Sequence, residues 1–499
     1  MIGIDIGTSQ AKGGVFDETG SCLARGSASY EISSPYPTWA ETDPEEWWKA
    51  IKDIIGQVLS QARVKAEDIG GISISSLVPC CVPIDRRGTP LRKAILWLDR
   101  RTEKECKWLE ENIGLDKCME ISGNRINPYY WGPKVLWFKN NEPELFAKTW
   151  KLLQAHSYPV FKLTGETVTD FSCGGLCVPL YDYRKKSWSS YGCEVMGVPP
   201  EILPQLKPSF EVVGRVSEVA SRETGLKKGT LVVTGCGDFA ASTLGAGVIE
   251  EGEACIMLGT AGNLLIPMKE PRFDSRMINS AHAVAQRFIT FANSFAGGSL
   301  QWFLNLLKGP EDKNLSMNSA LSYELLDLEA SLVKSGSEGL VFLPHLAGEL
   351  TLDWNPKARG VFFGLSLNHT RAHMFRAILE AIGYRYLHML EIVESQGISV
   401  REATLINGGG ESKLWRQILA DITGLTLLYT ESEGAPLGNA ILAGMGIGII
   451  TDAGQTRSWF KVKDKNEPNL KNYHRYTEYF KLYQELYLHL KKDFEHRYK

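Results

Sequence analysis

The chain has 499 residues, of which 43% are hydrophobic, and a formal net charge of −3. This length predicts two domains, and the lack of a basic surplus argues against nucleic acid as a partner. The opening MIGIDIGTSQ has no basic segment, which argues against a secretory signal, and the most apolar run, 440–450, is too short to cross a membrane. We therefore expect a soluble, cytoplasmic protein.

The first half of the chain shows patterns typical of alternating strands and helices. The turn Gly7-Thr8-Ser9 separates two β-prone segments, and the sequence DETG closes a further turn. A helix is predicted to begin after Asp43, which can cap it, because Pro44 suits the first helical position and apolar residues then recur at helical spacing. Strands are predicted at 2–6, 12–16, 69–76 and 94–99.

The second half repeats this strand–turn–strand unit. Gly259-Thr260 separates two apolar segments as Gly7-Thr8 does, about half the chain further on. Two such units, one opening each half, predict two related lobes that face a common cleft. Helices are then predicted at 371–395, at 412–423 before a capping Gly424, and beyond 455, where an aromatic, charged helix is expected to lie on the body of the protein.

The segment GTLVVTGCGDFAASTLGAG, residues 229–247, allows two interpretations. Its Gly-x-Gly-x-x-Ala pattern is close to the fingerprint of a dinucleotide site, yet Asp238 follows the second glycine, where a pyrophosphate would meet negative charge. A dinucleotide unit also needs an acidic residue at the end of the next strand, and that strand ends in Gly259-Thr260 instead. The pattern therefore favours a turn that presents an aspartate.

The glycine turns carry hydroxyl groups suited to phosphate. Backbone N–H groups and hydroxyls of Gly7-Thr8-Ser9 and Gly259-Thr260 can bind phosphate oxygens, with Lys12 nearby as a positive charge. Asp5 ends the first predicted strand, where a carboxylate can hold Mg²⁺. One such turn alone is more often a simple hairpin, but turns in both halves favour a phosphate-bearing nucleotide in a cleft.

The ten cysteines are scattered and form no Cys-x-x-Cys pair. His369 and His373 lie four residues apart, without the glutamate of a His-Glu-x-x-His site. We expect buried, reduced thiols and no zinc centre.

Several segments in order resemble the FGGY carbohydrate kinases, in particular their xylulokinase-like branch. The two family signatures are matched by PKVLWF (133–138) and by GVFFGLSLNHTRAHMFRAILE (360–380). The other matching segments are IGIDIGTSQAKGGVFD, WAETDPEEWW, AILWLDRR and LINGGGESKLWRQILADITG. Each match is moderately specific, whereas the ordered set, which runs from residue 2 to about 450, is very specific.

This resemblance implies an α/β fold of two ribonuclease-H-like lobes, of the actin and hexokinase type, around a central cleft. We expect an N-terminal sugar-binding lobe at 1–244, a nucleotide-binding lobe at 245–455 and a helical tail at 456–499. The implied activity is ATP-dependent phosphorylation of a small carbohydrate, most simply a pentulose. Another sugar or polyol, or a catalytically silent sensor on the same fold, stays open, as does a homodimer.

The resemblance also assigns roles to residues. Asp238 becomes the catalytic base, with Asp5 and Asp238 at the Mg²⁺ site. Substrate is expected to contact Ser76, Leu77, Tyr129, Asp238 and Phe239. ATP is expected to contact Thr8, Ser9, Lys12, Gly259, Thr260, Gly297, Gln301, Gly409, Gly410, Ser412 and Trp415.

The chain departs from the family where the sugar is expected. Leu77, Val78 and Pro79 stand where pentulose kinases usually carry glutamine, methionine and histidine, and Phe239 stands where asparagine or glutamine is usual. Apolar side chains cannot pair sugar hydroxyls, so we expect these positions to influence substrate choice and D-xylulose to be a poor substrate. Alternatively, water bridges the gap, or the missing contacts come from Ser76, Tyr129, Asp99 or Arg101.

Overall fold

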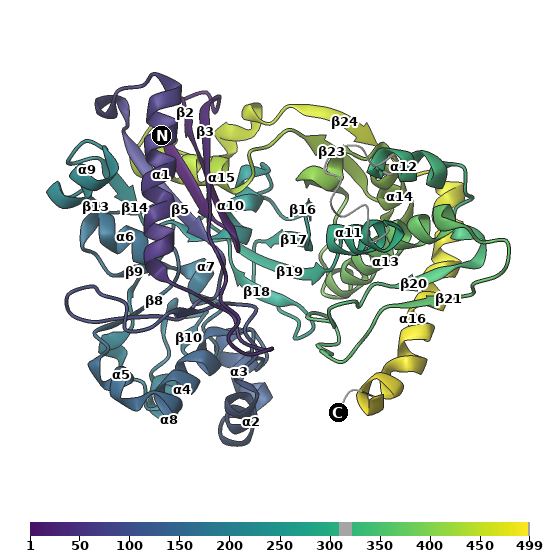
Figure 1. Cartoon of the computed structure of the whole chain (residues 1–499), viewed down its shortest axis with the longest axis horizontal. Helices are drawn as coiled ribbons and strands as arrows, with labels where there is room; N and C mark the ends of the chain where they lie inside the picture. The colour runs from purple at the N-terminus through teal and green to yellow at the C-terminus, as the bar shows by residue number, and fades with distance from the viewer. Residues whose placement is uncertain (309–321, 498–499) are drawn as a thin grey trace.

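The structure is a computed structural model that describes residues 1–308 and 322–497. Two α/β lobes, each built on a seven-stranded sheet, lie side by side in Figure 1, with the N-terminal lobe on the left. Among the described residues, no helix is long and apolar enough to span a bilayer.

The sheet of the first lobe has the strand order β13-β14-β5-β1-β2-β3, with β15 beside β5. β1 pairs antiparallel with β2 and parallel with β5, so the predicted strand–turn–strand unit is present. The strands are β1 (Ile2–Ile6), β2 (Gln10–Phe16), β3 (Cys22–Ser29), β5 (Gly71–Ser76), β13 (Val212–Arg215), β14 (Leu231–Val233) and β15 (Cys236–Gly237).

One predicted strand of the first lobe is much shorter than expected. The segment 94–99 contributes only β7 (Ala94–Ile95), which pairs with β4 (Glu41–Thr42) outside the main sheet. The chain then turns, because Asp99 accepts a hydrogen bond from the Ala40 N–H and its own N–H donates to the Leu96 carbonyl. The remaining helices of this lobe include α2 (Glu103–Asn112), α3 (Leu115–Ser122), α4 (Trp131–Asn141), α5 (Pro143–Lys148), α6 (Ser157–Thr164), α7 (Phe171–Gly174), α8 (Ser190–Met196) and α9 (Glu218–Thr224).

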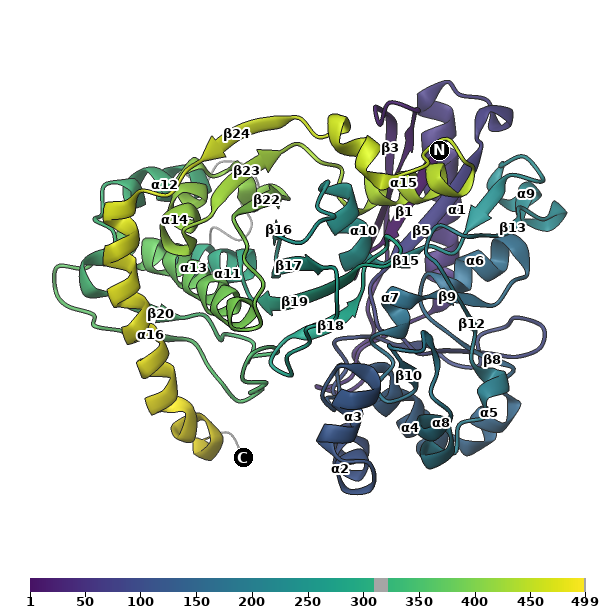
Figure 2. The same cartoon turned by 180° about the vertical axis from the view of Figure 1, so that it is seen from behind.

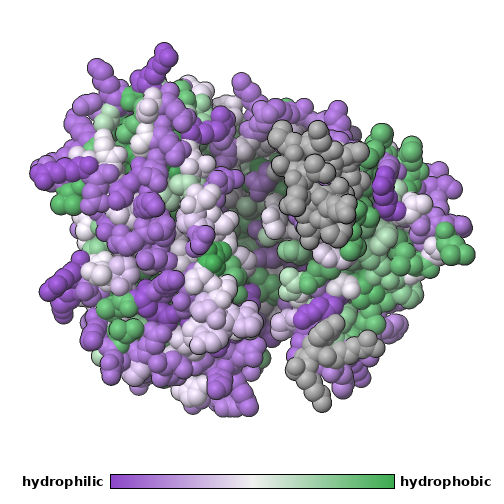
Figure 3. Space-filling view, viewed as in Figure 1, coloured by the Kyte–Doolittle hydropathy of each residue, from purple (hydrophilic) through white to green (hydrophobic). Residues whose placement is uncertain are grey.

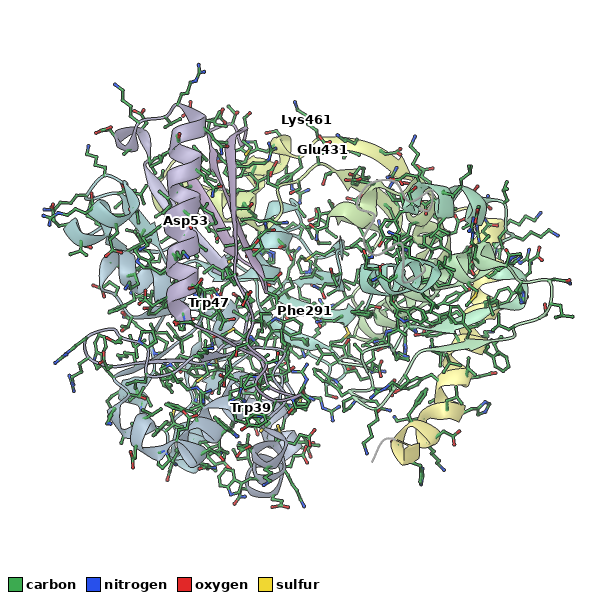
Figure 4. The ribbon with its side chains drawn as sticks, viewed as in Figure 1. Trp39, Trp47, Asp53, Phe291, Glu431 and Lys461 are labelled. Atoms are coloured by element: carbon green, nitrogen blue, oxygen red, sulfur yellow. The ribbon has the colours of Figure 1, made fainter. Side chains whose placement is uncertain are left out.

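Helices cover both faces of the first sheet. Successive side chains of a strand point to opposite faces. Ile2, Ile4 and Ile6 therefore pack together on the side of α1 (Pro44–Ala62), in a core that includes Trp47. α1 lies in front of the sheet in Figure 1 and carries the Trp47 labelled in Figure 4, whereas α15 (Ala435–Gly446) lies in front in Figure 2.

α15 comes from late in the chain and packs in the first lobe. It contacts β1, β5 and α10 (Asp238–Gly245). A Cβ atom on Gly3 would lie 1.9 Å from the Pro436 carbonyl oxygen, so only glycine allows β1 to approach this helix so closely. The helix lies inside the range 245–455 that we expected for the second lobe, and those lobe limits stay a prediction.

The second lobe repeats the arrangement, with the order β18-β19-β17-β16-β22-β23-β24. Its strands are β16 (Glu253–Leu258), β17 (Gly262–Met268), β18 (Ile278–Ala281), β19 (Phe288–Ser294), β22 (Glu402–Ile406), β23 (Thr426–Thr430) and β24 (Val462–Asn466). Its helices are α11 (Gly297–Leu307), α12 (Tyr323–Ser331), α13 (Arg371–Ser395), α14 (Lys413–Thr423) and α16 (Leu470–Arg497). α16 buries Tyr476, Phe480 and Tyr483 in the core it shares with α13, so the last helix lies on the body as predicted.

The lobes meet at β18 and β19. Asn124 and Asn279 bind reciprocally: the Asn279 N–H donates to the Asn124 side chain at 2.9 Å, and the Asn124 amide donates to the Asn279 carbonyl at 2.7 Å. Phe239 stacks on Phe291, labelled in Figure 4, with ring centroids 4.7 Å apart. Figure 3 shows a hollow between the two lobes.

Candidate active site

Asp5 lies where two parallel strands run side by side. In the register of β1 and β5, Asp5 is the partner of Ser75, and on the other side it is the partner of Lys12 on β2. The Ser75 hydroxyl donates to Asp5 Oδ1 at 2.6 Å. Burial raises the pKa of Asp5, while the Ser75 bond and the Lys12 charge oppose that rise.

Asp238 follows β15, at the same end of the parallel strands as Asp5. Gly235 has a φ of +77°, and a Cβ atom there would lie 1.9 Å from the Ile74 carbonyl oxygen, so the turn requires glycine. Asp238 is the first residue of α10, and its carboxylate accepts the Phe239 N–H at 2.8 Å. Burial, and then the neighbouring Asp5 carboxylate, raise the pKa of Asp238 well above its ordinary value.

The two carboxylates suit a hard divalent cation. Neither Asp5 nor Asp238 forms an ion pair within 4 Å among the described residues, and the Asp5 charge raises the cost of ionising Asp238. Oxygen donors of this kind are what Mg²⁺ binds, commonly through one or two carboxylates together with phosphate. The residues present therefore fit the expected cation.

The first phosphate turn is a tight hairpin with free hydroxyls. The Gly7 N–H donates to the Gln10 carbonyl at 3.0 Å, and Tyr30 N–H donates to the Ser9 carbonyl at 3.1 Å. The side chains of Thr8 and Ser9 have no hydrogen-bond partner among the described residues, so both hydroxyls are free for a ligand.

The second turn is held by the start of α11. Gly297 N–H donates to the Gly259 carbonyl at 2.9 Å, and Gly298 N–H donates to the Thr260 carbonyl at 3.0 Å. A Cβ atom on Gly297 would lie 2.6 Å from that Gly259 oxygen, which explains the glycine. Thr260 is exposed, and the structure brings Gly259, Thr260 and Gly297 together, whereas their contact with ATP stays a prediction.

The glycine-rich turn of 408–411 lies beside this second turn. A Cβ atom on Gly409 would lie 2.7 Å from Leu258 Cβ and 2.8 Å from the Trp415 ring. Ser412 caps α14 by accepting the Trp415 N–H at 3.0 Å. Trp415 itself is only 2% exposed, so it supports the turn from beneath, and this burial argues against the expected contact between its ring and a nucleotide.

Gln301 and Asn407 also belong to the second lobe. Gln301 lies on the exposed side of α11, where it bonds to Asn305 and accepts the Tyr323 hydroxyl, so its side chain is already engaged. Asn407 has a φ of +74°, unusual for a residue with a side chain, and its amide nitrogen would lie 3.8 Å from a Cβ on Gly259. Asn407 was not among the expected site residues, and in the sequence it is marked only by its place before three glycines.

Besides Asp238, the residues expected to contact the sugar, called here the expected sugar wall, are Ser76, Leu77, Tyr129 and Phe239, and all four are buried. Tyr129 is buried near Asp238, which together with burial raises the pKa of its hydroxyl, and that hydroxyl donates to the Val78 carbonyl at 3.3 Å. Ser76 Oγ accepts the His156 N–H at 2.9 Å. Leu77 packs in the first-lobe core at 1% exposure, which argues against its expected contact with substrate. Phe239 is 4% exposed against Phe291.

The ion pairs of Arg101 with Asp99 and Glu41 argue against the alternative that Asp99 and Arg101 contact the sugar. Arg101 binds Asp99 and Glu41, and its guanidinium stacks 3.5 Å from the centre of the Trp39 ring, which Figure 4 labels. Both groups are thus occupied in holding the turn after β7. Arg100, between them, forms no ion pair among the described residues, and burial lowers its pKa although Tyr129 lies near.

All ten cysteines are free thiols, and nine are buried, as predicted. In the part of the chain that the structure describes, His156, Asp170 and Cys173 form a buried group whose ligand atoms lie within 4.8 Å of one another. Asp170 already accepts the N–H groups of Ser172 and Cys173 and the Ser209 hydroxyl, so it caps α7.

Family models cover nearly the whole chain. Residues 1–245 match the N-terminal domain and residues 254–447 match the C-terminal domain of one family. The chain belongs to the FGGY family of carbohydrate kinases. It is thus a phosphotransferase, and the two-lobed, actin-like architecture expected from the sequence is confirmed.

Among similar FGGY kinases are several xylulose kinases. That of Bacillus subtilis (strain 168) is 32% identical over 98% of this chain and 97% of its own length, and that of Escherichia coli (strain K12) is 33% identical over 89% of each. A gluconokinase of Bacillus subtilis is 29% identical over 90% of this chain and 88% of its own. The crystal structure of xylulose kinase from Rhodospirillum rubrum superposes with a TM-score of 0.90, at 27% identity over 99% of each chain.

Proposed function

We propose that this FGGY kinase phosphorylates a pentulose, with ATP as donor and Mg²⁺ as the metal ion. Use of ATP follows from the family. The observation that supports the catalytic assignment is the glycine turn that carries the Asp238 carboxylate to within electrostatic reach of Asp5. The full-length similarity to xylulose kinases supports the substrate class.

In this proposal Asp238 is the general base. Its carboxylate accepts the proton of the attacking sugar hydroxyl as the new O–P bond forms and the bond from the γ-phosphorus to ADP breaks. A raised pKa makes this carboxylate a stronger base, which suits the task. Mg²⁺, when bound, offsets charge on the phosphate oxygens. Thr8, Ser9, Lys12 and Thr260 hold and orient the phosphates.

A carbohydrate that bears a carboxylate is the second candidate substrate. Among the described residues, the Arg100 guanidinium donates only to the carbonyls of Trp97 and Asp99, and it lies near Tyr129, on the expected sugar wall. An arginine without a carboxylate partner suits an anionic ligand. The 29% identical gluconokinase agrees with this alternative.

Measuring ADP release upon addition of sugar tests the proposal. The panel comprises D-xylulose, D-ribulose, L-ribulose, L-xylulose, D-gluconate and small polyols. We expect release with a ketopentose and none without an acceptor; release with D-gluconate alone would select the second candidate. ADP release in the absence of any sugar would contradict a sugar kinase. Absence of ADP release with every member of the panel would contradict this substrate class. If D-xylulose is the best substrate by a wide margin, the apolar residues Leu77, Val78, Pro79 and Phe239 do not govern specificity.

Assembly as a homodimer stays a prediction, which sedimentation analysis can test.

A further inference from the structure

Asn439 is a fully buried amide at the centre of the contact between α15 and the first sheet. Its Nδ2, which carries two hydrogens, lies within hydrogen-bond distance of three acceptors, the Ser75 hydroxyl at 2.7 Å, the Ile4 carbonyl at 2.9 Å and the Ala435 carbonyl at 3.0 Å. Its Oδ1 accepts the Ser73 hydroxyl at 2.9 Å. One side chain therefore joins β1 and β5 at the residues adjacent to Asp5.

The orientation of this amide is fixed by its partners. The Ile4 and Ala435 carbonyls can only accept hydrogen bonds, so the nitrogen of Asn439 must face them and its oxygen must face Ser73. An amide nitrogen can only donate, so at the 2.7 Å contact, the shortest of its three, the Ser75 oxygen is the acceptor. Because Ser75 has a single hydroxyl proton, that proton is then available for Asp5 Oδ1.

This chain of bonds leaves Asp5 with one occupied and one available oxygen. Oδ1 accepts the Ser75 proton at 2.6 Å, whereas Oδ2 receives no hydrogen bond from any residue that the structure describes. Without Asn439, the Ser75 hydroxyl could rotate toward the Ile4 carbonyl or accept from another group. The carboxylate would then lose the contact that sets its rotation.

α15 is itself held firmly on both sides of Asn439. A Cβ atom on Gly438 would lie 1.9 Å from the Ala241 carbonyl oxygen of α10, and Gly3 makes the equally close approach to Pro436. The same turn of helix thus packs against α10, which begins with Asp238, and against the strand that carries Asp5. Asn439 is therefore anchored relative to both carboxylates.

We propose that Asn439 is a positioning residue that orients the Asp5 carboxylate for a divalent cation through the Ser75 hydroxyl. This inference rests on the proposed function only in that Asp5 is taken as a metal ligand. It assigns a role to a residue more than 400 positions away from Asp5 in the chain. Partners that orient metal ligands typically affect metal affinity or activity by about 10–100-fold when removed.

The test uses Mn²⁺ as a spectroscopic substitute for Mg²⁺. Free Mn²⁺ is measured by electron paramagnetic resonance in titrations of the full-length protein with ADP present. Asn439→Leu and Ser75→Ala are each expected to weaken Mn²⁺ binding about tenfold. The double variant should bind no more weakly than Ser75→Ala alone, because both changes break the same path. Ile441→Val, a small change at another buried position of α15, is the matched control and should bind Mn²⁺ normally.

Kinetics add a second readout that a general loss of packing would not reproduce. With the best sugar, both variants should need a higher Mg²⁺ concentration for half-maximal activity, while the KM for the sugar stays within about twofold of the wild type. Unchanged Mn²⁺ affinity in either folded variant, or additive losses in the double variant, would overturn the proposal. Ser75→Ala keeps the backbone pairing of β5, so unchanged Mn²⁺ affinity in this variant would overturn the proposal even if Asn439→Leu does not fold. Mn²⁺ binding needs no sugar, so a wrong substrate class leaves this result readable.

Discussion

Replacing Gly438 by alanine should push apart the two helices that flank the carboxylates. The new Cβ atom would lie 1.9 Å from the Ala241 carbonyl oxygen and 3.0 Å from the Gly245 nitrogen, both of them backbone atoms of α10. An ordinary contact begins near 3.4 Å, so α10 and α15 must separate by roughly 1.5 Å along that direction. Neither partner is a side chain that could rotate away.

The magnitude follows from two effects. Overpacking of a well-packed core typically costs about 1–3 kcal/mol. A misplacement of about 1 Å at a catalytic group can cost about a hundredfold in rate. We therefore expect Gly438→Ala to lower the free energy of unfolding by about 1–3 kcal/mol and kcat by about a hundredfold, measured by urea denaturation and by ADP release.

Gly56→Ala provides the matched control. Gly56 lies on the exposed side of α1, where a Cβ atom would meet nothing within 4 Å. Alanine there should stabilise the protein by up to about 1 kcal/mol through helix propensity and leave kcat unchanged. If Gly438→Ala keeps wild-type stability and turnover, the close crossing of α10 and α15 does not position the carboxylates.

Three further predictions concern single side chains. Asp238→Asn should lower turnover about a hundredfold or more while nucleotide affinity is retained, and wild-type turnover would refute its role as base. The pKa of Asp238 is raised in the folded state, so ionising it lowers the stability of the wild type as pH rises above the ordinary carboxyl range. Asp238→Asn should therefore melt at a higher temperature than the wild type at alkaline pH, and not in acid. Thr260→Val should raise the KM for Mg·ATP and spare the melting temperature; an unchanged KM would place the phosphates elsewhere. Lys134, whose pKa burial lowers to about 7, donates to the Tyr129 carbonyl at 2.8 Å, so Lys134→Met should raise the sugar KM. Since the folded state binds fewer protons than the unfolded state between pH 7 and about 10.5, wild-type stability should rise over that range, and the variant should lose this slope.

Local patterns predict much of the backbone around the candidate site. The alternation in Ile2–Ile6 predicts the strand that ends near Asp5, and the glycines before Asp238 predict the sharp turn, because both depend on neighbouring residues alone. The position of Leu77 was not predictable in this way, since the core that buries it is assembled from distant segments. The same holds for Trp415, which family resemblance placed against the nucleotide and the structure places beneath the turn.

Asn439 shows most clearly which contacts could not be predicted from the sequence. In the sequence it precedes the run 440–450, which reads as a glycine-rich apolar segment and gives no sign of its partners. Its contacts with Ile4 and Ser75 depend on a helix that returns across the molecule, and only the fold brings these residues together.

The return of α15 to the first lobe has a consequence for how the protein is made. The ribosome synthesises β1 more than 400 residues before α15, the helix that covers one face of the same sheet. Domains usually fold as units during synthesis, with the N-terminal one first. Here Gly3, Asp5 and the adjoining face of β5 stay uncovered until α15 has been synthesised. A fragment that stops near residue 245 should therefore leave this face of the sheet uncovered and depend on chaperones or aggregate.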